Sequence, residues 1–122
     1  MEHGKTVWLL PDCYYPADST EGPYVSHEAV CVLNATENEA HIHMTLFFED
    51  DEPVDDFYAV CGARRTNHIR LDSLKSAGGR SIPKGRGYAM LLESNVPIVC
   101  QYSRVDTTQE RLGLATTIPY AP

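Results

Sequence analysis

Short runs in which apolar and polar residues alternate recur along the whole chain, and each run predicts a β-strand. Ala40–Glu49 is the clearest case, because every second residue from Ile42 to Phe48 is apolar and the residues between are mostly polar. No comparable helical period is found. The predicted strands are Thr6–Leu10, His27–Leu33, Ala40–Glu49, Phe57–Val60, Thr66–Leu71, Tyr88–Glu93, Ile98–Tyr102 and Arg111–Ile118.

About eight short strands separated by turn-rich segments are typical of an antiparallel β-sandwich. The longest connections are residues 12–24 and 73–87, which are rich in glycine and proline. A chain of 122 residues also suits one domain. The sequence therefore predicts an all-β, jelly-roll-like sandwich in a single domain.

The net charge of the chain disfavours some classes of binding partner. Seventeen acidic residues outweigh ten basic ones and give a net charge of −7, which repels nucleic acid and anionic membranes. No segment approaches the roughly 20 apolar residues of a membrane-spanning helix, and the start of the chain does not resemble a signal peptide. We expect a cytoplasmic protein.

The four cysteines form no Cys-x-x-Cys pair, so we expect free thiols and no zinc site. His41 and His43, with Glu49, are a weaker candidate for a metal site, as in a cupin-like enzyme. The alternative is that this strand face is simply exposed. We expect no metal or other cofactor.

A basic cluster extends from just before the predicted strand Thr66–Leu71 into that strand, in this otherwise acidic chain. Arg64, His68 and Arg70 have the same parity and share one face of an extended segment, while Arg65 points the other way. Guanidinium groups are suited to carboxylates, phosphates and hydroxyls. The cluster therefore predicts a ligand pocket. The alternative is a solvated face that pairs with acidic residues, either of the same chain or across a subunit contact.

A second polar cluster ends a later strand. Gln101 falls on one face of that strand and Arg104 on the other, and an Arg104–Asp106 pair could hold the following turn. His27 and Glu28 begin an earlier strand and could orient the arginines or, less plausibly, transfer protons. The single tryptophan, Trp8, is either a core anchor or a stacking platform for a ligand.

Five blocks of this sequence, in order, resemble the sensory rhodopsin transducer family. The blocks are Ser26–Ala35, Glu52–Val54, Ala63–Arg70, Ser94–Asp106 and Thr117–Ala121. The resemblance extends from about Trp8 to Ala121. The first loop and the Ser76–Arg86 loop depart from it.

The resemblance implies a small cytoplasmic jelly-roll sandwich that assembles into a homotetramer. It also implies contact with the cytoplasmic side of a membrane photoreceptor or, in relatives without one, binding of sugars or related metabolites. The resemblance further implies DNA binding, as suggested for the family member that partners a rhodopsin. The net negative charge of this chain argues against binding of nucleic acid here.

From these observations we expect a non-enzymatic module that binds a sugar or small anionic metabolite and signals through oligomer or partner contacts. A protein–protein adaptor without a small ligand is the main alternative, followed by a metal enzyme and a DNA-binding regulator. The predicted site consists of Arg64, Arg65, His68, Arg70, Gln101, Arg104, Asp106, His27, Glu28 and Trp8.

Overall fold

The computed structural model describes residues 3–19 and 22–122. These residues form seven strands and no helix. The strands are β1 (Lys5–Tyr14), β2 (His27–Asn34), β3 (Ala40–Phe47), β4 (Val54–Cys61), β5 (Arg65–Arg70), β6 (Gly87–Asp106) and β7 (Gly113–Thr117). Within the same residues, no helix is long and apolar enough to cross a membrane.

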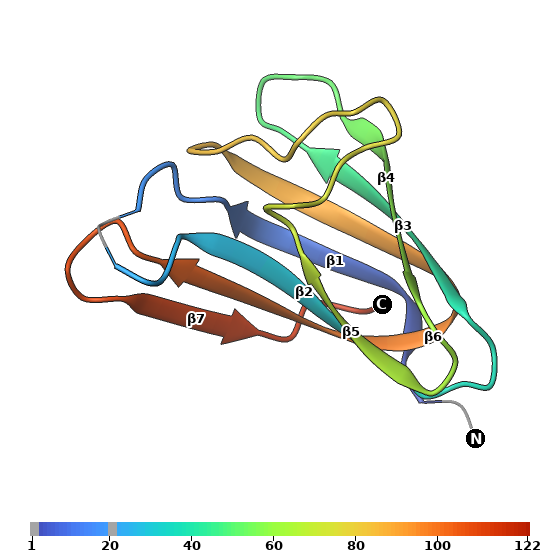
Figure 1. Ribbon diagram of the computed structural model, residues 1–122. Coiled ribbons are helices and arrows are strands. Elements are labelled where there is room, and N and C mark those ends of the chain that lie inside the picture. Colours follow the sequence, from blue (N-terminus) through green and yellow to red (C-terminus); the bar gives the residue numbers. More distant parts are fainter. Residues whose placement is uncertain (1–2, 20–21) are drawn as a thin grey trace.

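The strands form two antiparallel layers that share β6 (Figure 1). In the first layer β6 pairs with β1 and β3, and β3 pairs with β4. In the second, β6 pairs with β2 and β7, and β2 pairs with β5. This arrangement confirms the predicted all-β sandwich.

The strand count differs from the prediction because β6 is one strand of 20 residues. The sequence Ser94–Pro97 was expected to separate two strands. It is instead the place where β6 bends and changes partners, from β3 up to Ser94 to β2 from Val99 onwards. Figure 1 shows β6, in orange, turning back at the end of the sandwich.

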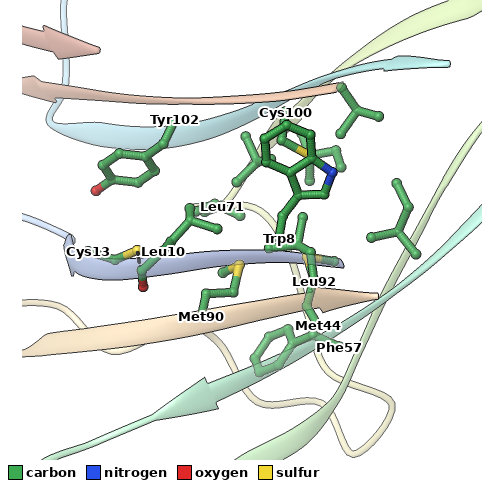
Figure 2. Close-up of a cluster of buried hydrophobic side chains, with 14 of the residues drawn as sticks. Trp8, Leu10, Cys13, Met44, Phe57, Leu71, Met90, Leu92, Cys100 and Tyr102 are labelled. Atoms are coloured by element: carbon green, nitrogen blue, oxygen red, sulfur yellow. Dashed lines mark hydrogen bonds between the residues drawn. The ribbon is translucent and has the colours of Figure 1, made fainter. Parts of the chain in front are cut away.

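The core fills the space between the two layers (Figure 2). Alternation places Trp8 and Leu10 of β1 opposite Leu92 and Met90 of β6, and all four side chains are buried. The indole N–H of Trp8 donates to the carbonyl oxygens of Lys5, at 3.0 Å, and Ile98, at 3.2 Å. Trp8 is thus a core anchor, and its prediction as a ligand-stacking residue does not fit this burial.

Candidate functional site

A buried carboxylate lies near the start of β2, in the second layer of the sandwich. Glu28, near the start of β2, is fully buried at the inner face of the sheet. Its Oε1 accepts the backbone N–H of Tyr14 at 2.8 Å and also the hydroxyl of Tyr102. Its Oε2 accepts the hydroxyl of Tyr88 at 2.6 Å. Hydrogen bonds of this kind, from donors to a charged acceptor, are what make a buried carboxylate tolerable.

The two tyrosines are in turn constrained by this carboxylate. Burial, together with the charge and hydrogen bonds of Glu28, raises the pKa of Tyr88 and of Tyr102 above the ordinary tyrosine value. The two hydroxyls therefore stay protonated at neutral pH and act as donors to Glu28.

Arg104 lies directly opposite Glu28 in the antiparallel pairing of β2 with β6. Its Nε donates to the Tyr102 hydroxyl at 3.3 Å, and its Nη2 donates to the carbonyl of Asp12 at 3.4 Å. Nη2 also lies 3.8 Å from the Asp12 carboxylate, whose side chain is 90% exposed. Burial opposes the charge of Arg104, but Tyr102, Asp12 and Glu28 outweigh it and raise the pKa of the guanidinium.

Arg104 and Tyr102 also line a cavity of about 410 Å³. Figure 2 shows two of its lining residues, Leu10 and Tyr102, at one end of the core. The remaining wall comes from β1, from β7 and from the segment after β7: Pro11, Asp12, Ala115, Thr116, Thr117, Ile118, Pro119 and Tyr120. That last segment is fastened to β1, because the backbones of Leu9 and Tyr120 exchange two hydrogen bonds of 2.8 and 3.1 Å.

The opposite face of the second layer carries a different part of the predicted site. His68 of β5 and Gln101 of β6 flank Cys31 of β2 in one row across the sheet, and both are exposed. Arg70 lies one step along the same face and binds Asp72 through two hydrogen bonds of 2.8 Å. His27 shares this face by its parity in β2. The face predicted to be shared by Arg64, His68 and Arg70 is therefore correct for His68 and Arg70. It is wrong for Arg64, which precedes β5 in a turn and has a positive φ.

The predicted pocket is nevertheless divided by the sheet. Gln101 lies on the outer face, whereas Arg104 lies on the inner face beside Glu28. The basic turn, which carries Arg64 and Arg65, is also distant from Arg104. Arg65 pairs with Asn34, which lies six residues along β2 from Glu28, the residue opposite Arg104. At about 3.3 Å per residue that separation is roughly 20 Å, too far for one small ligand.

The other residues of the basic turn are exposed. Arg64 adopts a positive φ of 53° and lies 3.8 Å from the carboxylate of Glu37. Arg65 donates to the carbonyl of Arg64. The turn is therefore a solvated one, as the alternative interpretation of the basic cluster described it.

The expected Arg104–Asp106 pair is also replaced by other partners. The Asp106 carboxylate accepts the backbone N–H of Thr108 at 2.9 Å and its hydroxyl at 2.6 Å. These hydrogen bonds lower the pKa of Asp106. Asp106 thus holds the turn after β6, and Arg104 faces Asp12 instead.

Sequence reasoning missed several residues that contribute to this end of the molecule. Tyr88, Tyr102 and Asp12 were not in the predicted site, although they contact Glu28 or Arg104. The parity of β6 carried one usable signal, because Tyr102 and Arg104 fall on the same face of that strand. Nothing in the sequence indicated that β1 and the segment after β7 close the cavity.

Comparison with known proteins identifies relatives over almost the whole chain. The family model described as Anabaena sensory rhodopsin transducer matches residues 3–121. The crystal structure of Thermotoga maritima 1070 is 38% identical, with a TM-score of 0.86 over 98% of this chain and 96% of that chain. The structure of the Anabaena sensory rhodopsin transducer is 37% identical, with a TM-score of 0.75 over 90% and 96% of the two chains. Among curated proteins no match was found.

Proposed function

The chain belongs to the Anabaena sensory rhodopsin transducer family, and on that premise we propose that it is a non-enzymatic signalling module that binds a small anionic metabolite. Sugar acids and sugar phosphates are included in that class. Arg104 is the anchoring cation, and Glu28 and Tyr102 position it. Arg104 is one of the ten residues predicted from sequence, and it lines a cavity of suitable size.

The observation that carries the proposal is the pairing of that cavity with a single, oriented guanidinium. A volume of about 410 Å³ lies within the range of about 300–1,000 Å³ found for small-molecule sites. A guanidinium presents a planar set of donors that matches an anionic oxygen pair. The hydrogen bond to Tyr102 fixes the guanidinium at the cavity wall.

Ligand occupancy has a structural route to a partner. The cavity wall joins β1, β6, β7 and the segment that carries Ile118 and Tyr120, so a ligand would contact elements of both layers at once. The side chains of Ile118 and Tyr120 are 61% and 65% exposed, which makes this segment available to a second protein. A ligand shifts such a contact only by preferring one arrangement of the segment over another.

The partner in this proposal is a membrane photoreceptor or another signalling protein, reached from a homotetramer in the cytoplasm. The Anabaena relative is by name the transducer of a sensory rhodopsin. The four cysteines are free thiols in the structure, which suits a reducing compartment.

An adaptor without a small ligand is the second candidate, favoured by the outer face of the second layer. There Leu33 and Leu114 are 50% and 72% exposed. They lie on either side of the row that contains His68 and Gln101, because they pair with Val99 and Val105 of β6. Exposed apolar side chains among polar ones on a sheet face can form part of a protein contact surface. In this candidate His27, His68, Arg70 and Gln101 contact a protein.

A thermal-shift screen against sugars, sugar acids, sugar phosphates and apolar carboxylic acids separates the two candidates. A ligand at a hundredfold excess over its Kd stabilises the folded state by about 2.7 kcal/mol. We expect a hit that disappears in Arg104→Gln and persists in the matched control Arg64→Gln, whose side chain is 70% exposed. A blank across the panel contradicts the proposed function and favours the adaptor, whereas a hit that survives Arg104→Gln contradicts the proposed site alone.

A further inference from the structure

We propose that the cavity beside Arg104 takes a monocarboxylate with an apolar body, such as an aromatic or branched aliphatic acid, in preference to a polyhydroxylated sugar. This inference rests on the proposed function and deepens it, because it names the ligand chemistry of the same site. Four features of the cavity lead to it: the apolar walls, the placement of the polar groups, the number of charges and the position of Asp12.

The walls of the cavity offer mostly apolar contact. Leu10 and Pro11 come from β1, and Ile118, Pro119 and Tyr120 come from the segment after β7. Each hydroxyl of a bound sugar needs a hydrogen-bond partner, since a buried polar group without one costs about 1–3 kcal/mol. A ligand with one polar end and an apolar body matches these walls better than a sugar does.

The polar groups of the cavity gather at one end and are partly engaged. The Tyr102 hydroxyl already donates to Glu28 and accepts from Arg104. The hydroxyl of Thr116 faces away from Arg104, because it lies 3.3 Å from that of Ser103 on the outer face of the sheet. Arg104 has five N–H donors, and within the described chain two of them make the hydrogen bonds given above. Donors therefore remain at this end for one carboxylate.

The charges around Arg104 favour one negative charge over two. Arg104 is the one cationic residue in the described cavity lining, and it already faces Glu28 and Asp12. The Glu28 charge is held by its three hydrogen bonds. A phosphate dianion would bring two further negative charges beside one guanidinium, whereas a carboxylate brings one and can exchange for Asp12.

Asp12 occupies the position that a ligand carboxylate would take. Its Oδ1 lies 3.8 Å from Arg104 Nη2, and its side chain is almost fully exposed. A long, solvated ion pair of this kind is weak and easily displaced. Asp12 is thus an intramolecular competitor for an anion. Its replacement by asparagine removes that competition without disturbing a buried group.

The test measures binding of 4-fluorophenylacetate by ¹⁹F NMR. Binding of glucose, gluconate and glucose 6-phosphate is measured by calorimetry for comparison. We expect the fluorinated acid to bind more tightly than the three sugar compounds. Asp12→Asn should tighten its binding by up to about fivefold, because an exposed pair is worth about 0.2–1 kcal/mol. Arg104→Gln should weaken it by at least about tenfold, since hydrogen bonds to a charged group contribute about 1.5–3 kcal/mol.

A pair of substitutions on β7 tests the position independently of Arg104, whose replacement could disturb Glu28. Ala115→Phe places a ring in the cavity and should abolish binding. Leu114→Phe is the matched control, because Leu114 is 72% exposed on the other face of the same strand and should leave binding unchanged. Both variants are first compared with the parent by thermal unfolding.

The outcomes distinguish this inference from the proposed function. Binding of gluconate or glucose 6-phosphate through Arg104, without binding of the apolar acid, overturns the inference and leaves the proposed function standing. If none of the four probes binds, both fall. Binding of the acid that ignores Ala115→Phe, or that weakens in Asp12→Asn, also overturns the inference.

Discussion

Replacing Glu28 by glutamine tests whether the buried carboxylate organises this end of the sandwich. The substitution keeps the side-chain volume, so the change in stability reports charge and hydrogen bonding without a new cavity. Three donors point at the carboxylate in the native state: the Tyr14 N–H and the hydroxyls of Tyr88 and Tyr102. In the variant one of the two side-chain oxygens becomes an amide group that cannot accept from them.

The expected loss follows from those three bonds. A hydrogen bond to a charged group contributes about 1.5–3 kcal/mol and a neutral one about 0.5–1.5 kcal/mol, so the two retained bonds weaken by about 1 kcal/mol each. The third donor loses its acceptor, and Arg104 loses an opposing charge across the sheet. We expect Glu28→Gln to lower the free energy of unfolding by about 2–4 kcal/mol.

Urea denaturation followed by tryptophan fluorescence measures this loss. Trp8 is the single tryptophan and is only 5% exposed, so its emission reports unfolding of the core. Tyr88→Phe removes one donor and should cost less than Glu28→Gln. Glu37→Gln is the matched control, because the Glu37 side chain is 80% exposed and its loss should cost less than about 0.5 kcal/mol. A loss as small in Glu28→Gln would refute the role given to this carboxylate.

Two further predictions concern cysteine accessibility and acid stability. N-ethylmaleimide should label the native protein at Cys31 alone, because the other three thiols are at most 1% exposed and burial raises the pKa of Cys100 to about 12; intact mass should show one adduct before denaturation and four after it. Hydrogen bonds from Thr108 lower the pKa of Asp106 below its ordinary 3.8. Its contribution is therefore present at neutral pH and is lost as pH falls through the lowered value. Urea denaturation curves of the parent and Asp106→Asn should therefore converge as the pH is taken further below 3.8.

The strands could be predicted from the sequence because alternation reports directly which face of a strand is buried. Ala40–Phe47 is the example, since its alternate apolar residues form part of the core. The continuity of β6 could not be predicted in the same way. The sequence from Ser94 to Pro97 has the composition of a turn, and a bent strand that changes partners has that composition as well.

The site was predicted less completely because a pocket depends on which strands become neighbours. Parity within β5 correctly placed His68 and Arg70 on one face. The distance between Arg65 and Arg104, however, follows from where β5 and β6 each pair along β2. Alternation within a single strand carries no information on that register. The segment containing Tyr120 closes the cavity through contacts with β1, over a hundred residues away in sequence.

Glu28 and Arg104 also give a reason why this end of the core is polar. A buried carboxylate costs free energy unless it is hydrogen-bonded, so packing alone does not account for Glu28 at this position. What Glu28 does hold in place is Tyr102, and Tyr102 in turn holds the guanidinium of Arg104 against the cavity. Hydrogen bonds thus connect the buried Glu28 through Tyr102 to Arg104 at the cavity wall. Because Glu28 and Tyr102 hold it, the guanidinium of Arg104 keeps one orientation at the cavity wall. The proposed recognition of one carboxylate requires that fixed orientation.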